Sequence, residues 1–422
     1  RTAVLVSILS MRAQAPVRLE LSREEEFVAG RRRHSTQTTL RMGLKKDGEI
    51  TAIHAKTVMD TGAYLSSGPG VARRAGQGAL YLYRCPNVRY EGSLVYTNTP
   101  TAGSYRALGA PQGHYALECV ADLAAESLGI DPLEFRRKNH VGLEGQPGER
   151  ITPVTEIVDT QPSEGGIPFS SNGLSECLAL GADRIGWGKP VDGIHKSSSK
   201  SIKRGRGMSM FLYRGGPGGK AHASITLTED SSYSLATGVM DVGEGSATVL
   251  SQIASQVLST SYDSIDLVMG DTDITPEASI TAGSSVTFSS GLAVKRAAEI
   301  LRDKILNQAA KFLGDSQHAL RLRGSGVTSD SGAFISICDL VEHSGAINAE
   351  ATIVPGSSDY VINSFGAHFV EVEVDVETGR VNISRYVAAH DAGTIINPKM
   401  AESQVRGGVS QMMGFTFLED ME

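Results

Sequence analysis

The sequence predicts an α+β fold. Three segments have the alternating pattern of β-hairpins, at residues 40–60, 222–241 and 368–391. Segments with apolar residues three or four positions apart, typical of amphipathic helices, lie between the hairpins. The two kinds of segment do not follow one another as regular βαβ units, so a doubly wound sheet is disfavoured. The chain of 422 residues is long enough for two or three domains with cores of their own.

Glycine marks the turns of the hairpins. Asp47-Gly48 separates the strands of the first hairpin, and Thr378-Gly379 those of the third. All three hairpins end in Asp-x-Gly, at residues 60–62, 241–243 and 391–393. Two explanations fit the repeated Asp-x-Gly about equally well. The hairpins belong to related subdomains, or strands commonly end in a polar residue followed by a glycine turn.

Helices are predicted from apolar spacing and from end signals. Gly129 can end one helix, and Asp131-Pro132 is a strong start for the next, with the N-cap acid followed by proline. Gly314 can end a third. The predicted ranges are residues 112–128, 246–258 and 289–313, with a further helix beginning at Pro132.

A stretch rich in Ser, Lys and Gly at residues 189–207 has the composition of a linker. We therefore expect a first domain at residues 1–190, a linker at 191–205 and a second domain at 206–422.

Composition excludes several classes of function. The net charge is −7 and no long basic block occurs, so a nucleic-acid surface is not expected. No apolar run approaches the roughly 18 residues of a membrane span, and no signal peptide is found. The four scattered cysteines argue against a zinc or iron–sulfur site within this chain and favour a reducing, cytoplasmic location.

Two loops are candidate anion sites because each precedes a predicted helix. GSYRALGAPQG, at residues 103–113, places small residues where a backbone can approach a ligand, with Arg106 beside them. The alternative is an ordinary Gly-Pro loop with a solvated arginine. TAGSSVTFSSG, at residues 281–291, offers Ser284 and Ser285 to a phosphate, and its alternative is a simple helix N-cap.

Three further motifs are weaker signals. MDVGEG reads as a strand, a glycine turn and a helix entry, with Glu244 unexpectedly between two glycines. RGGPGG, at residues 214–219, implies a close ligand or an exposed loop, and it lacks the GK[ST] ending of a P-loop. His390-Asp391 has the composition of a catalytic dyad, but a histidine packed beside a turn aspartate is the favoured interpretation.

Taken together and in order, eight segments resemble the large subunit of the molybdenum hydroxylases, the xanthine dehydrogenase and aldehyde oxidase family. The resemblance extends over essentially the whole chain. The segments are PVRLELSREEEF, DTGAY, YRALGAPQ, DPLEFRRKN, DVGEG, GDTDITP with the following TAGS, AAHDAGTIINP and QVRGGVSQMMG.

The resemblance implies two elongated molybdopterin-binding domains of mixed hairpin sheets and helices. In the family, molybdenum is held by the dithiolene of a pyranopterin, often extended as a cytosine dinucleotide, and the protein supplies no metal ligand. Glycine-rich loops and helix-entry amides would neutralise this polyanion. The implied cofactor-binding residues are Tyr105, Arg106, Ala107 and Gly109 beneath the metal, Gly243, Glu244, Gly245, Thr281, Ala282, Gly283 and Ser284 around the pterin and phosphates, and Gln411 near the pterin.

The resemblance also implies a substrate pocket of Arg74, Arg106, Leu108 and Tyr213. Arg74 falls where purine-oxidising members orient the substrate, although an alignment shifted by one residue selects Arg73, and a surface arginine is the alternative. Leu108 and Tyr213 fall where those enzymes hold two phenylalanines. Leu108 weakens that aromatic sandwich and puts a purine substrate in doubt, whereas Tyr213 can still stack.

Two family motifs are expected outside the chain. A GGxFGGK-type loop would precede Arg1, and the general-base glutamate of a GxGE-type motif would follow Glu422. We therefore expect a large subunit truncated at both ends, with no catalytic residue of its own and no activity alone. Implied partners are iron–sulfur and FAD subunits or domains and a second chain completing the large subunit, within a homodimeric complex.

The expected reaction is hydroxylation of a purine, another N-heteroaromatic compound or an aldehyde, with oxygen from water. The alternatives are an aromatic thioester reductase of the hydroxybenzoyl-CoA type and a non-catalytic cofactor-binding or assembly module. Many relatives have Gln at the position of Glu244. Because a carboxylate would repel phosphate, we expect Glu244 to face pterin nitrogens or a cation such as Arg106.

Overall fold

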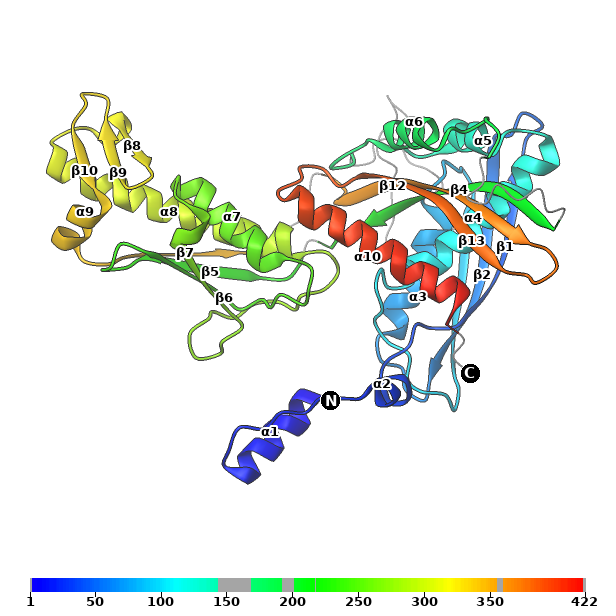
Figure 1. Cartoon of the computed structure of the whole chain (residues 1–422), viewed down its shortest axis with the longest axis horizontal. Coiled ribbons are helices and arrows are strands. Elements are labelled where there is room, and N and C mark those ends of the chain that lie inside the picture. The colour runs from blue at the N-terminus through cyan, green and yellow to red at the C-terminus, as the bar shows by residue number, and fades with distance from the viewer. Residues whose placement is uncertain (1, 143–167, 192–200, 217, 355–359, 420–422) are drawn as a thin grey trace. The chain divides into compact units, whose positions relative to one another are not determined.

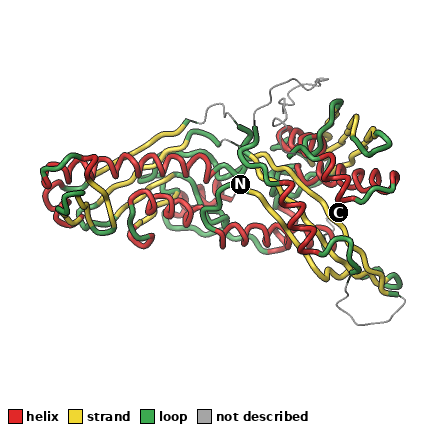
Figure 2. Tube along the Cα trace, turned by 90° about the horizontal axis from the view of Figure 1, so that it is seen from above, coloured by secondary structure: helices red, strands yellow, loops and turns green. Residues whose placement is uncertain are grey.

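Helices and small sheets are interspersed along the chain, which confirms the predicted α+β class (Figure 1, Figure 2). The computed structural model describes residues 2–142, 168–191, 201–216, 218–354 and 360–419. Two compact units occur, one formed by Arg1–Gly166 with Met208–Leu212 and the other by Ile167–Gly207 with Tyr213–Glu422.

The domain boundary expected at residues 191–205 stays a prediction. Residues 192–200 of this stretch lie outside the described residues, and strand β4 (Ile202–Arg214) begins within the expected linker.

The first unit is built on a three-stranded sheet in the order β1-β2-β3. The predicted hairpin around Asp47-Gly48 is confirmed, because β1 and β2 are antiparallel and Gly48 is left-handed, with a φ of 86°. Strand β3 then joins β2 in parallel after a helix. The elements are α1 (Thr2–Ala13), α2 (Arg23–Ala29), β1 (Thr36–Leu44), β2 (Ile50–Gly62), α3 (Gly68–Leu80), β3 (Val88–Tyr96), α4 (Ala110–Leu128) and α5 (Pro132–Asn139).

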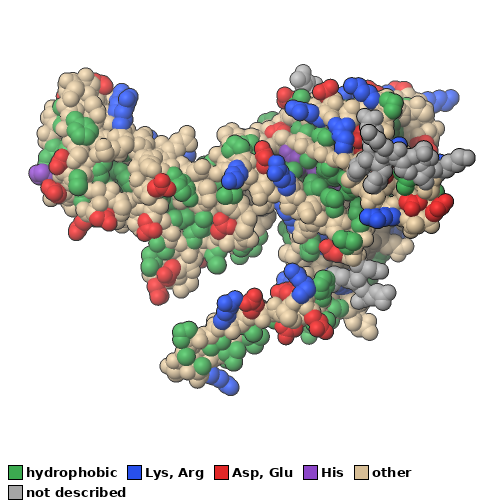
Figure 3. All heavy atoms as spheres, viewed as in Figure 1, with side chains coloured by type: hydrophobic (Ala, Val, Ile, Leu, Met, Phe, Trp, Pro, Cys, Tyr) green, Lys and Arg blue, Asp and Glu red, His purple; other side chains and the backbone are tan. Residues whose placement is uncertain are grey.

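The predicted helices of this unit are confirmed. Gly129 ends α4 in a left-handed conformation, with a φ of 65°. The Asp131 carboxylate accepts hydrogen bonds from the amides of Leu133 and Glu134 and so caps α5. Helix α1 was not predicted from the sequence. Most of its apolar side chains are exposed (Figure 3).

Helices α3 and α4 approach each other at glycines. A Cβ atom added to Gly78 would lie 2.6 Å from the carbonyl oxygen of Ala110, and one added to Gly113 would lie 2.7 Å from the amide of Ala79. Only residues without a side chain allow such contact between two backbones. The loop immediately before α4 is thereby held against α3.

A buried carboxylate ties α4 to its surroundings. Glu118 accepts hydrogen bonds from the Tyr83 hydroxyl, from Arg136 Nε at 2.9 Å and from the Met210 amide at 2.8 Å. The Arg136 side chain is fully buried and also pairs with Asp122. Burial and then the Glu118 charge raise the pKa of Tyr83 well above its usual value, so the phenol stays a neutral donor.

The second unit contains three sheets, in the orders β13-β12-β4, β11-β5-β6-β7 and β10-β9-β8. Residues Met208–Leu212 of β4 belong to the first unit. The remaining elements are α6 (Leu174–Ile185), β5 (Ala221–Leu227), β6 (Tyr233–Thr237), α7 (Ser246–Leu258), β7 (Ile265–Met269), α8 (Val286–Leu313), β8 (Leu320–Arg323), β9 (Gly326–Ser329), β10 (Phe334–Ser336), α9 (Ile337–Ser344), β11 (Ile347–Ile353), β12 (Asn363–Asp375), β13 (Val381–Asp391) and α10 (Pro398–Phe417), with short 3₁₀ turns at Tyr262–Ser264 and Gln317–Ala319.

Helix α8 forms the centre of the second unit's core. Its buried face, which includes Ala293, Ala297, Leu301 and Ile305, packs on β5, β11 and α7. The predicted helices at 246–258 and 289–313 are confirmed as α7 and α8, and Gly314 ends α8 with a φ of 72°. The two remaining predicted hairpins are confirmed as the antiparallel pairs β5–β6 and β12–β13.

The three Asp-x-Gly sequences form the same local turn. The amides of Gly62, Gly243 and Gly393 donate to the carboxylate two residues earlier, at 2.6, 2.8 and 2.9 Å. All three glycines are left-handed. The repeated Asp-x-Gly is thus accounted for by turn chemistry, in which an aspartate bonds the amide two residues on and glycine supplies the positive φ.

Replacing Arg136 by alanine is expected to lower the free energy of unfolding by about 3–5 kcal/mol, because Glu118 would remain buried without its cation. Urea unfolding followed by circular dichroism measures this change. Arg137→Ala is the matched control on the same helix: its ion pair with Glu134 is exposed, so the loss should stay below about 1 kcal/mol. Equal losses in the two variants would contradict the role assigned to the buried pair.

Candidate functional site

The loop from Tyr105 to Gly109 has an unusual backbone. Ala107, Leu108 and Gly109 are consecutive left-handed residues, with φ values of 65°, 46° and 95°. A left-handed conformation costs a non-glycine residue roughly 1–2 kcal/mol. Such strain persists only where the surrounding structure imposes it, and it concentrates at functional sites.

Arg33 imposes the shape of this loop. Its Nη2 donates to the carbonyl of Arg106 at 2.8 Å, and its guanidinium carbon lies 4.3 Å from the centre of the Tyr105 ring. Nη1 reaches Gln112 Oε1 at 3.4 Å. One buried cation therefore fixes both ends of the loop through hydrogen bonds and stacking. The side chain of Arg106 remains exposed.

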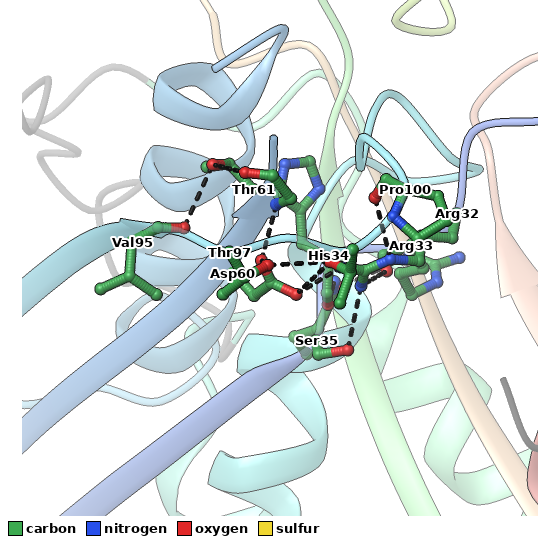
Figure 4. Close-up of polar contacts among 12 residues, drawn as sticks. Arg32, Arg33, His34, Ser35, Asp60, Thr61, Val95, Thr97 and Pro100 are labelled. Carbon is green, nitrogen blue, oxygen red and sulfur yellow. Dashed lines mark hydrogen bonds and ion pairs between the residues drawn. The ribbon is translucent and has the colours of Figure 1, made fainter. Parts of the chain in front are cut away.

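A second network supports the segment that leads into this loop (Figure 4). Asp60, at the end of β2, pairs with Arg32 and accepts a hydrogen bond from Thr97 at 2.6 Å. Arg32 also donates to the carbonyl of Pro100 at 3.2 Å. Burial opposes ionisation of Asp60, but Thr97, the Gly62 amide and Arg32 outweigh it and lower the pKa of the carboxyl. The DTGAY motif thus supplies an ionised anchor for residues 97–100.

In the second unit, Asp241 organises the MDVGEG turn. Its carboxylate accepts hydrogen bonds from the amides of Gly243 at 2.8 Å, Gly245 at 3.3 Å and Ala247 at 3.0 Å. Gly243 and Gly245 are left-handed, with φ values of 102° and 88°. Burial opposes ionisation of Asp241, but the amides of Ala247, Gly243 and Gly245, and then the neighbouring Glu244 carboxyl, lower its pKa overall.

Glu244 is held by its own turn. Its Oε2 accepts a hydrogen bond from the Val242 amide at 2.7 Å. Its Oε1 is buried and finds no hydrogen-bond partner within the part of the chain that the structure describes. A buried carboxylate oxygen without a partner is costly, so this atom is poised to accept a donor from a ligand.

The other glycine and serine loops meet this turn. Thr281 Oγ1 accepts from the Met240 amide at 3.2 Å and donates to its carbonyl at 2.8 Å. The Gly216 amide donates to the Gly283 carbonyl at 3.1 Å, which places Gly216 against the loop of residues 281–284. Ser284 is left-handed, with a φ of 58°.

Helix α10 closes the same cluster. Gln404 Nε2 reaches the Gly243 carbonyl at 3.4 Å, and a Cβ atom added to Gly245 would lie 3.0 Å from Met400 Sδ. Gln411 lies about two turns further along this helix. The expected loop residues of the second unit thus lie on two loops joined through Thr281 and Met240, and the place of Gln411 beside them stays a prediction.

The residues expected to contact substrate belong to both units. Arg74 is half-buried on α3, with its Nη1 3.3 Å from Gln77 Oε1, while Arg73 is exposed. Leu108 and Arg106 lie on the strained loop, which Gly109 brings against Val71 of the same helix. Tyr213 is half-buried near the end of β4, in the second unit.

The two members of the candidate His390-Asp391 dyad have separate partners. Asp391 accepts hydrogen bonds from Ser171 and from the amides of Gly173 and Gly393. The His390 ring meets that of His368 instead. These contacts agree with the favoured interpretation, a histidine packed at a strand end beside a turn aspartate.

Comparisons with known proteins agree over nearly the whole chain. Residues 1–140 and 181–422 each match the model of a molybdopterin cofactor-binding domain. The xanthine dehydrogenase molybdenum-binding subunit of Escherichia coli O157:H7 is 32% identical, over 96% of this chain and 54% of the relative. A probable hypoxanthine oxidase of Escherichia coli K12 is 31% identical, over 96% of this chain and 42% of the relative.

Solved structures share the fold. The quinoline 2-oxidoreductase of Pseudomonas putida 86 gives a TM-score of 0.80 at 23% identity and covers 97% of this chain and 54% of the other. The aldehyde oxidoreductase of Desulfovibrio gigas gives 0.75 at 24% identity and covers 97% of this chain and 43% of the other. The chain spans about half the length of the curated relatives it matches.

Asp241→Asn is expected to lower the free energy of unfolding by about 1–3 kcal/mol at pH 7, because one amide oxygen cannot replace a carboxylate that serves three amides. The pKa of Asp241 is lowered in the fold, so its stabilisation is present above the ordinary pKa and is lost as pH falls through the folded-state pKa. The difference between the two proteins should therefore shrink in acid. Urea unfolding across a pH series measures it, with the exposed Asp266→Asn as control; a pH-independent difference would refute the assignment.

Proposed function

Since the chain belongs to the xanthine dehydrogenase and aldehyde oxidoreductase family through its two molybdopterin-binding domains, we propose that it forms the cofactor-binding part of a hydroxylase. The proposed substrate is a purine or another N-heteroaromatic compound, with an aldehyde as the next choice. Water supplies the oxygen atom. Electrons leave to iron–sulfur and flavin groups on partner chains, a proposal supported by relatives that are named as molybdenum-binding subunits.

The residues of the second unit fit a molybdopterin. The observation that carries this proposal is the MDVGEG turn, in which Glu244 presents a buried and unpartnered Oε1 within the described structure. Pterin N–H groups are donors that suit such an oxygen. A Cβ atom added to Gly243 would meet no atom within 4 Å, so the backbone there is open to a ligand. The adjoining loop at 281–284 supplies glycine and serine in front of the N-terminus of α8, where anions are favoured.

The chain's own residues hold and orient the group. When bound, the molybdenum cofactor supplies the two-electron redox chemistry. Asp241 keeps the amides of its turn in fixed positions, and Glu244 accepts a pterin N–H rather than facing a phosphate. The amides and hydroxyls near Gly283 and Ser284 receive phosphate oxygens. In the first unit, Arg33 holds the strained loop and stacks on the Tyr105 ring. In the second unit, Gln411 on α10 completes the proposed set of cofactor-binding residues.

The relatives favour a purine over an aldehyde. Those named for xanthine and hypoxanthine are 28–32% identical and include the relatives above 30%, whereas those named as aldehyde oxidoreductases are 26–29% identical. Arg74 is proposed to bind an oxygen or nitrogen of the ring, and Tyr213 to stack on it. Leu108 contributes an aliphatic wall where an aromatic ring would stack more strongly.

The test is to produce the chain with its natural neighbours in a host that makes molybdenum cofactor. Metal analysis and pterin release after oxidation report cofactor binding, and an artificial electron acceptor reports turnover of purines, other heteroaromatics, aldehydes and an aromatic acyl-CoA. Purine turnover by the complex but not by the chain alone supports the proposal. Acyl-CoA reduction instead would identify a thioester reductase, and bound cofactor without turnover would identify a non-catalytic module.

Gly243→Ala is expected to lower the molybdenum content per chain at least several-fold, because a methyl group would occupy the space in which the backbone meets the ligand. Gly314→Ala is the matched control at the end of α8. Both glycines are left-handed and both are open, so the two variants share a backbone strain of about 1–2 kcal/mol. Equal molybdenum content in the two variants would show that Gly243 does not face the cofactor.

Arg74→Gln is expected to reduce kcat/KM for a purine by roughly 10- to 100-fold in the assembled complex, the range for losing a hydrogen bond to a charged group. Turnover of an aldehyde, which offers no ring nitrogen, should change much less. Arg73→Gln, its exposed neighbour, is the control and separates the two possible alignments. A selective loss in the control and not in Arg74→Gln would transfer the role to Arg73.

A further inference from the structure

Two histidines converge on the β12–β13 hairpin of the second unit. His368 Nε2 and His390 Nε2 lie 2.7 Å apart, and the ring centres are 4.9 Å apart. In the strand register His368 lies opposite Ala388 and His390 lies opposite Gly366. The two rings are therefore diagonal neighbours on one face of the sheet, and glycine opposite His390 leaves room for its ring.

Tyr386 orients the first of these rings. Its hydroxyl lies 2.7 Å from His368 Nδ1, on the side of the ring away from His390. The tyrosine and histidine rings meet edge to face, with centres 5.5 Å apart. When Nδ1–H donates to the tyrosine oxygen, the Nε2 lone pair is directed at His390. Metal-binding histidines are held in their tautomer by the same kind of bond to the far nitrogen.

Neutral imidazole is the form that binds metal ions. A divalent ion needs the tautomer of each ring that leaves its Nε2 atom unprotonated.

We propose that His368 and His390 form a two-histidine chelate for a divalent transition-metal ion of the nickel, copper and zinc group. Metal–nitrogen bonds of about 2.1 Å at right angles place two nitrogens about 3 Å apart, which is close to the observed spacing, and the rings must turn so that both lone pairs meet at the ion. Both Nε2 atoms donate lone pairs, and each ring keeps its single proton on Nδ1. No group of three histidine, cysteine or acidic ligands occurs among the described residues.

The site shares no residue with the loops proposed to hold the cofactor. His390 lies at the end of β13, one residue before Asp391. A bound ion would cross-link β12 and β13 at that point. The ligand chemistry depends only on the hairpin, so the proposal does not rest on the proposed function.

The probe is Ni²⁺, because exposed Cys119 and Cys338 would also bind Zn²⁺. Calorimetric titration of the full chain at pH 7.5 is expected to show saturable binding that is lost in His368→Ala and in His390→Ala. Tyr386→Phe removes the orienting hydroxyl and should weaken binding by about 10-fold. His222→Ala removes a histidine of β5 that bonds Thr352 and should leave binding unchanged.

Circular dichroism establishes that each variant is folded, and a nickel-induced rise in melting temperature gives an independent readout of binding. If His368→Ala does not fold, loss of that rise in folded His390→Ala supports the chelate, because His390 is the more exposed of the two histidines. Unchanged nickel binding in both histidine variants, or no saturable binding by the native chain, would overturn the proposal.

Discussion

The first unit depends on one buried carboxylate. Glu118 gathers a phenol, a guanidinium and a main-chain amide from three separate stretches of chain onto the middle of α4. A buried ion pair contributes little net stability by itself, but removing one partner is strongly destabilising. Its effect here is positional: α4 is fixed, its contact with α3 through Gly78 and Gly113 is fixed, and the loop entering α4 is presented in one geometry.

The second unit also fixes its loops through a carboxylate, that of Asp241, but with hydrogen bonds to a single turn and its neighbours. Asp241 holds three amides of one turn, the Thr281 hydroxyl bonds the Met240 main chain next to it, and the Gly216 amide bonds the Gly283 carbonyl in the loop that carries Thr281. Each loop that is proposed to contact the cofactor is thus shaped by hydrogen bonds inside the protein. Sites supported in this way present their donors and acceptors in place before a ligand arrives.

Periodicity and turn chemistry predicted the hairpins and the helices α4, α5, α7 and α8, because those signals are local. The cofactor loops were selected by their resemblance to a family, and their role stays a prediction. What could not be predicted depends on distant partners. Arg33 lies in a run that has the composition of an exposed basic segment, yet it meets a loop about seventy residues away. The repeated Asp-x-Gly could be recognised in the sequence, but only the structure shows the hydrogen bonds that its aspartates accept.

The left-handed run at Ala107, Leu108 and Gly109 has a consequence for assembly. A loop that folding has already forced into a rare conformation has little conformational entropy left to lose when a ligand binds. Binding of the proposed molybdenum cofactor at this loop would then resemble docking onto a rigid receptor. The rate of maturation would be set by how the group gains entry, and the ordering of this loop would contribute little to the barrier.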